Sequence, residues 1–206
     1  MLFNISVLIS LLVCLLMLRR FVGVFPSLMA CIVRWKESVN LDAGATLSRD
    51  RDMMALAMIL PFCLCAEKFS LYDPTWMGNL GPGGRLGAVI GIFTAYASVR
   101  KGLEYALRPK KMNPKTYRTA GKASYTFFIL LTLMLMATGG LLSFADVNPG
   151  IIRNAMLWVS AITYALFLLR KTQIFVSSCN FFSSFLYLCA LEILPTGALV
   201  ASALIF

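Results

Sequence analysis

A single acidic side chain, Glu192, lies within an otherwise apolar run from Phe181 to Phe206. A carboxyl group in hydrocarbon is costly to bury, and such groups commonly carry protons or ions or pair with a neighbouring helix. At helical spacing, Cys189 and Thr196 lie on the same face as Glu192. Pro195 has no N–H, so it frees a backbone carbonyl one turn earlier and predicts a bend beside the carboxyl. These residues predict either a proton-carrying site beside a hinge or a neutral acid that fixes how helices dock.

The partners of Glu192 must come from other helices at the same depth. Counted from Phe181, Glu192 lies near the middle of a membrane-length helix. The hydroxyl groups expected at that depth belong to Thr132, Thr138, Ser160 and Thr163. No Lys or Arg is expected there, and burial without an opposite charge favours the protonated acid. We therefore expect Glu192 to be neutral.

Other reactive side chains support little further chemistry. The chain has no histidine, which excludes Ser-His-Asp and Cys-His catalysis and histidine-ligated zinc or haem. Cys63 and Cys65, with Met54 and Met58, are soft ligands for Cu(I), but residues two apart point to different helix faces. Ordinary apolar packing explains them better. We predict no metal and no other cofactor.

The composition indicates the environment of these residues. Hydrophobic residues make up 59% of the chain, charged residues only 14%, and the mean hydropathy is +0.79. A water-soluble domain of this length would lack the polar surface to cover itself. We predict an all-α, polytopic membrane bundle in a single domain, residues 1–206. A span needs about 20 residues. The six predicted spans are 2–18, 53–72, 86–99, 125–145, 151–169 and 181–206.

The basic residues predict the orientation, because Lys and Arg collect in cytoplasmic loops. With both termini outside, every one of the 19 basic residues except Lys68, Arg85 and Arg153 falls on the inner side. Residues 21–35 are too few to cross and are expected to lie along the cytoplasmic surface, followed by a polar connector up to residue 52.

The positive-inside bias also accounts for the net charge of +10, so no nucleic-acid partner is required. Anionic lipid headgroups are the expected partners of the basic loop before the fourth span, at about 1 kcal/mol per residue. The predicted headgroup residues are Arg108, Lys110, Lys111, Lys115, Arg118 and Lys122.

A stripe of small residues runs along the third predicted span. It consists of Gly83, Gly87, Gly91 and Ala95, which recur every four residues and so share one helix face. Small side chains let two membrane helices approach closely. The stripe predicts a helix-packing surface.

The sequence FFSSFLYLCALEILP, together with the Arg-rich segment after the first span, resembles the domain-of-unknown-function 4271 family, uncharacterised multi-pass inner-membrane proteins of Bacteroidetes. The resemblance implies that Tyr187, Cys189, Glu192 and Pro195 are positions of interest. It implies no activity. It supports the fold and the location rather than a function.

Three functions remain after this reading. The favoured hypothesis is an accessory or assembly subunit of a cell-envelope complex, which would have other membrane proteins as partners. The first alternative is a small proton-coupled transporter or channel subunit that uses Glu192. The second is a membrane enzyme acting on a lipid-linked substrate, with Glu67, Asp73 or Asp146 as acid or base.

Overall fold

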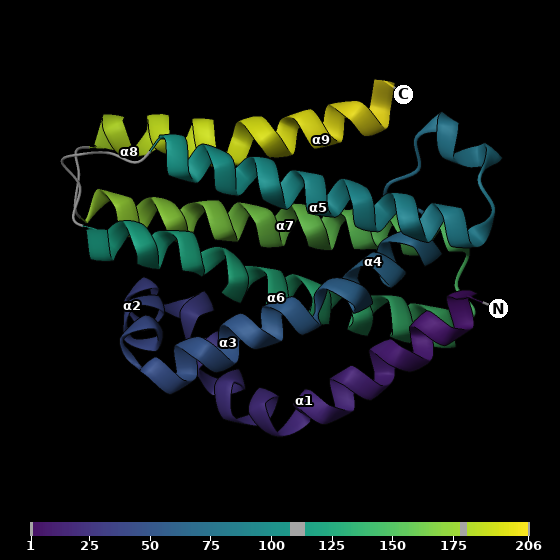
Figure 1. The fold of residues 1–206 in the computed structure, drawn as a ribbon, viewed down its shortest axis with the longest axis horizontal. Helices are drawn as coiled ribbons and strands as arrows, with labels where there is room; N and C mark the ends of the chain where they lie inside the picture. The colour runs from purple at the N-terminus through teal and green to yellow at the C-terminus, as the bar shows by residue number, and fades with distance from the viewer. Residues whose placement is uncertain (1, 108–113, 178–180, 206) are drawn as a thin grey trace.

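A computed structural model describes residues 2–107, 114–177 and 181–205, and every element in it is helical (Figure 1). The prediction of an all-α fold is confirmed. In chain order the elements are α1 (Leu2–Val33), α2 (Trp35–Ala43), α3 (Ala45–Ala57), α4 (Ile59–Lys68), the 3₁₀-helix η1 (Thr75–Asn79), α5 (Pro82–Ala106), α6 (Pro114–Phe144), α7 (Pro149–Val176), α8 (Phe181–Leu188), the π-helix η2 (Cys189–Ile193) and α9 (Leu194–Ile205).

Four segments of the described chain are long and apolar enough to cross a membrane. They are Asn4–Val33, Thr116–Phe144, Pro149–Val176 and Ser184–Ala203. Helix α5 differs because the uncharged stretch between Arg85 and Arg100 is shorter than the about 20 residues that a span needs. The count of six spans and the outward termini stay predictions.

The N-terminal region differs from the expected division into a span at 2–18 and a surface segment at 21–35. Helix α1 runs without interruption from Leu2 to Val33, because Arg19 and Arg20 are good helix formers and do not end it. The helix ends where Arg34 becomes extended, with φ −132° and ψ 119°. Arg170 of α7 donates hydrogen bonds to the carbonyls of Ile32 (2.6 and 3.0 Å) and Val33 (3.0 Å). These bonds satisfy carbonyls that the helix end leaves open.

The second predicted span, 53–72, is divided between α3 and α4. Pro61 has no N–H to donate to the carbonyl of Ala57, and the regular helix is interrupted at Met58 between them. The segment expected to be a polar connector is also helical, since it forms α2 and most of α3.

Helices α6 and α7 lie side by side through the middle of the bundle (Figure 1). Phe62 of α4, Phe93 of α5 and Phe128 of α6 meet with ring centroids 5.3–5.4 Å apart. Leu28 of α1 and Met54 of α3 are buried in an apolar cluster with Phe127 and Phe167 of the central pair. Helices α1 to α4 pack against the α6–α7 pair and α8 packs on α7, whereas α5 packs mainly on α4, with η2 and α9 lying along α5.

Candidate functional site

Glu192 lies in the π-helix η2, between α8 and α9. Pro195 explains this local widening: it cannot donate to the carbonyl of Leu191, and its ring would clash with that carbonyl in a regular helix. The amide of Leu194 instead donates to the carbonyl of Cys189, five residues earlier. The sequence predicted a bend here, and the structure has a π-turn, a feature that often occurs at functional sites. The turn buries the Glu192 side chain inside the bundle.

Two cations contact one oxygen of the Glu192 carboxylate. Arg100 of α5 donates to Oε1 from Nη2 at 2.6 Å and from Nε at 3.2 Å, and Lys171 of α7 donates to the same oxygen through Nζ. The Glu192 side chain is 1% exposed, that of Lys171 4% and that of Arg100 21%. The other oxygen, Oε2, is buried and has no hydrogen-bond partner in the described chain. We call Arg100, Lys171 and Glu192 the charge cluster.

The charge cluster overturns the expectation that no Lys or Arg lies beside Glu192. That expectation ended the third and fifth spans at residues 99 and 169, whereas α5 continues to Ala106 and α7 to Val176. Arg100 and Lys171 therefore lie inside the helices, roughly 8–9 Å from their ends at 1.5 Å per residue. The expectation of a neutral acid rested on the absence of an opposite charge at this depth, and two cations in contact with the carboxylate remove that basis.

The hydroxyl groups proposed as partners have other acceptors. Each of them donates to the backbone carbonyl four residues earlier in its own helix, at 2.7–2.9 Å; they are Thr132, Thr138, Ser160 and Thr163. This local bond is common for Ser and Thr within helices. Within the described residues, none of them forms a hydrogen bond to the charge cluster.

Aromatic rings and hydroxyl groups complete the surroundings of the charge cluster. The Phe167 ring centroid lies 5.7 Å from the Arg100 guanidinium and 5.6 Å from the Lys171 ammonium, within the range of cation–π attraction. Tyr164 donates its hydroxyl to the backbone carbonyl of Glu192 at 3.1 Å. The surroundings therefore hold the π-turn through its backbone as well as through its carboxylate.

Two further links join α9 to the rest of the bundle. The hydroxyls of Tyr96 and Thr196 lie 3.0 Å apart, and those of Tyr72 and Ser202 lie 2.9 Å apart. Thr196 was selected from the sequence because it shares a helix face with Glu192, and its hydroxyl contacts α5 rather than the carboxylate. Together with the charge cluster, these bonds fix α9 against α5 and the segment before η1.

The other two residues of the C-terminal motif lie outside the charge cluster. Tyr187 is half-buried and packs on an apolar cluster that includes Leu191 and Ile174. Cys189 is a half-buried free thiol whose backbone carbonyl closes the π-turn. Of the four motif positions, Glu192 alone places its side chain among the charged groups, while Pro195 acts by shaping the turn.

The small-residue stripe lies on an open face of α5. All four of its members, Gly83, Gly87, Gly91 and Ala95, are exposed. A Cβ atom built on Gly87 or Gly91 would meet nothing within 4 Å. The opposite face of α5 buries Leu86 and Val89 against α4. The stripe is therefore not used for packing by the described part of this chain.

The predicted headgroup residues fall into three groups. Arg108, Lys110 and Lys111 lie outside the described residues, and Lys115 lies in α6 without a described side chain. Arg118 is exposed near the start of α6. Lys122 forms ion pairs with Asp42 at 3.1 Å and with Asp52 at 3.4 Å. The sequence did not reveal this second polar cluster, because its acidic members lie in the segment expected to be a connector.

These observations define an all-helical protein with apolar helices of membrane length and a charge cluster buried between α5, α7 and η2. A family model matches residues 4–202, nearly the whole chain, and its description is "Domain of unknown function (DUF4271)". The chain belongs to this family, as the C-terminal motif predicted. No curated protein and no solved structure matches the chain.

Proposed function

We propose that the chain is an accessory or assembly subunit of a bacterial cell-envelope complex, embedded in the inner membrane by six spans. In this proposal α5 carries the surface that docks on a helix of another membrane protein. The observation that supports it best is the exposed stripe of Gly83, Gly87, Gly91 and Ala95. Close helix approach in a membrane depends on such small residues, because lipid supplies no hydrophobic force between helices.

The bundle holds α5 in a fixed position for this purpose. Toward one end, Arg100 binds Glu192, and one turn earlier Tyr96 bonds to Thr196. Toward the other end, Arg85 donates to the carbonyl of Met77 at 3.2 Å. A surface on a rigid helix loses less conformational freedom on binding than one on a mobile segment. In this proposal, the charge cluster holds α5 in place within the subunit.

Co-purification tests this proposal. The tagged chain is extracted from native membranes in mild detergent, and the bound proteins are identified and quantified by mass spectrometry. Gly91→Leu fills the stripe, and we expect it to reduce a stoichiometric partner at least tenfold. Gly23→Leu is the matched control, because Gly23 is an exposed glycine of α1 that also has nothing within 4 Å. A partner retained equally by both variants, or no stoichiometric partner for the parent chain, would contradict the proposal.

A second candidate function is proton-coupled transport through Glu192. Its support is the π-turn and the buried Oε2, which has no hydrogen-bond partner among the described residues, since intramembrane ionisable groups often mark proton or ion pathways. Glu192→Gln separates the two functions. If the charge cluster only holds α5 in place, the variant is less stable but still captures its partner. If Glu192 carries protons, the variant loses pH-driven flux in proteoliposomes.

A further inference from the structure

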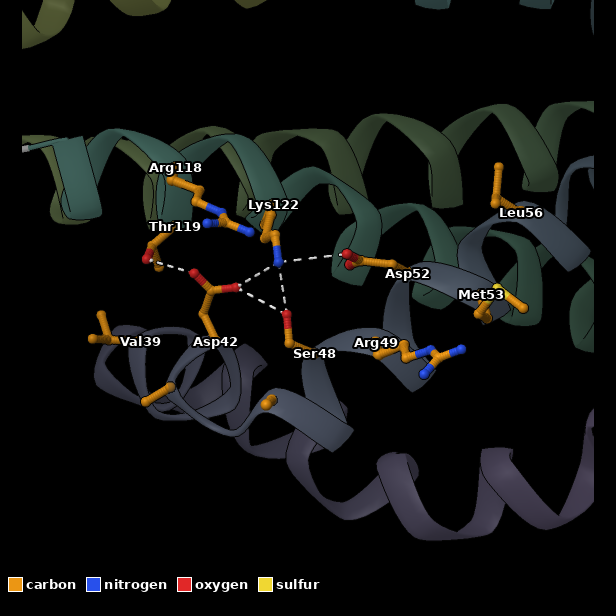
Figure 2. A pocket seen from close by; sticks show the side chains of 12 residues that line it. Val39, Asp42, Ser48, Arg49, Asp52, Met53, Leu56, Arg118, Thr119 and Lys122 are labelled. Atoms are coloured by element: carbon orange, nitrogen blue, oxygen red, sulfur yellow. Dashed lines mark hydrogen bonds and ion pairs between the residues drawn. The ribbon is translucent and has the colours of Figure 1, made fainter.

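A pocket of about 800 Å³ lies between α2 and α3 on one side and the first turns of α6 on the other (Figure 2). Its polar lining includes Asp42, Asp52 and Lys122, and its cationic rim includes Arg49 of α3 and Arg118 of α6. The pocket is at the end of the bundle where α1 ends and α6 begins, which the charge pattern predicts to be the cytoplasmic end.

The two carboxylates of the pocket are already paired within the chain. Asp42 accepts a hydrogen bond from Thr119 at 3.0 Å and lies 3.1 Å from the Lys122 ammonium. Asp52 lies 2.8 Å from the guanidinium of Arg51, whose side chain is 1% exposed. Arg51 also approaches Asp42 at 3.4 Å. A ligand therefore meets carboxylates whose charge is compensated.

Burial alone would raise the pKa of the Asp42 carboxyl. Hydrogen bonds from Lys122 and Thr119, with the charges of Lys122 and Arg51, outweigh that effect and hold the pKa below its usual value near 3.8. Asp42 thus remains a charged anchor for Lys122 at neutral pH. It fixes one wall of the pocket.

The pocket also contains Ser48 and Lys122 within hydrogen-bonding distance of each other, a pair that could suggest nucleophilic catalysis. Lys122 donates to the Ser48 hydroxyl oxygen at 2.7 Å. A lysine base must be free to take the serine proton, whereas here the Lys122 ammonium is held in ion pairs with Asp42 and Asp52. Ser48 in turn donates to Asp42 at 3.1 Å. The arrangement is that of a binding site rather than a hydrolase.

The cations of the rim remain available for a ligand. Arg49 and Arg118 are exposed and have no ion-pair partner among residues 2–107, 114–177 and 181–205. Because ion pairs compensate the charges of Asp42 and Asp52, the two arginines give the pocket an excess of positive charge. A guanidinium fork matches two oxygens of a phosphate, which makes arginine the preferred residue for this group.

Apolar side chains lie beside this charge. Val39, Met53 and Leu56 line the same pocket and are 41%, 40% and 65% exposed. Figure 2 shows Met53 and Leu56 on α3, beyond the network of Ser48, Asp52 and Lys122. A soluble phosphate would leave these groups uncovered. An acyl chain attached to the phosphate would cover them.

We propose that this pocket binds a phosphate-bearing anion, supplied by the headgroup of an anionic phospholipid whose chain covers the apolar side chains. Arg118 binds the phosphate beside Lys122, which Asp42 and Asp52 hold in place, and Arg49 adds positive charge at the other end of the rim. This inference is independent of the small-residue stripe, which lies on α5.

Native mass spectrometry of the full chain tests the inference, with phosphatidylglycerol and phosphatidylcholine as probes in the detergent micelle. The parent chain should retain phosphatidylglycerol in preference to phosphatidylcholine. We expect the double variant R49Q/R118Q to lose at least tenfold in apparent phosphatidylglycerol affinity. R153Q is the control, because Arg153 is an exposed arginine near the start of α7. Unchanged thermal unfolding midpoints for the variants exclude a folding defect.

Inorganic phosphate provides the second arm. If millimolar phosphate raises the unfolding midpoint of the parent chain but not of R49Q/R118Q, and phosphatidylglycerol shows no preference, the ligand is a soluble phosphate and the lipid assignment is wrong. Equal phosphatidylglycerol retention by the parent chain, R49Q/R118Q and R153Q overturns the site itself. Loss in R49Q/R118Q alone supports it.

Discussion

Glu192→Gln should destabilise the bundle by about 3–5 kcal/mol, the range expected when one member of a buried ion pair is removed. Glutamine keeps the volume of the side chain but carries no charge. The variant leaves the Lys171 ammonium, only 4% exposed, without its counter-charge. Arg100 is 21% exposed, so the loss of its counter-charge should cost less than for Lys171. The main loss therefore arises from Lys171.

The reciprocal change should cost less. Lys171→Met removes one cation, but Glu192 keeps both hydrogen bonds from Arg100. We expect a loss of about 1.5–3 kcal/mol, the value of a hydrogen bond to a charged group. The double variant Glu192→Gln/Lys171→Met has no unpaired buried ammonium. Its loss in free energy of unfolding should therefore be smaller than the sum of the two single losses by at least about 1 kcal/mol, which is within the range of coupling for contacting residues.

Equilibrium unfolding in mixed micelles of a mild detergent and sodium dodecyl sulfate, followed by circular dichroism, measures these free energies. Asp146→Asn is the control, since Asp146 is exposed and asparagine tolerates its positive φ of 51°. Its effect should stay within about 0.5 kcal/mol. A Glu192→Gln loss of that same size, or strictly additive losses in the double variant, would refute the role assigned to the charge cluster.

Two other perturbations test the helix ends and the polar pocket. Arg170→Gln removes the hydrogen bonds to the carbonyls of Ile32 and Val33; we expect a loss of about 1.5–3 kcal/mol and faster amide hydrogen exchange in the last turn of α1, and unchanged exchange there would contradict this. Since the folded-state pKa of Asp42 lies below its unfolded value near 3.8, its stabilisation is present above that pH and is lost as the pH falls through the folded pKa. The difference in thermal unfolding midpoint between the parent chain and Asp42→Asn should therefore shrink as the pH is lowered from 6 to 3. A constant difference would argue against the role of Asp42 as a charged anchor for Lys122.

Composition and apolar run length were sufficient to predict an all-helical fold, because backbone groups in hydrocarbon must be paired within each segment. Glu192 could also be selected, since a lone carboxyl in an apolar run stands out. Its partners could not, because a hydropathy pattern ends each span at the first charged residue. Arg100 and Lys171 follow apolar stretches directly, and only the packed structure shows that their helices continue past them.

The polar pocket escaped prediction for a different reason. Asp42 and Asp52 lie in a charged segment whose pattern is typical of a solvated connector, and their partner Lys122 is 70 or more residues away in the chain. A contact of that separation has no local signature. Pro195 marked the place of an irregular turn, but a missing N–H is compatible with a bend, a break or a π-turn, and tertiary packing selected the last.

The order of the charged residues along the chain has a consequence for biogenesis. Synthesis proceeds from the N-terminus, so Arg100 and Lys171 are made before Glu192. Until α8, η2 and α9 follow, these two cations lack the Glu192 carboxylate that pairs with them in the folded chain. The C-terminal segment α8–η2–α9 therefore supplies the counter-charge for α5 and α7, and a chain interrupted before residue 192 would leave both cations uncompensated.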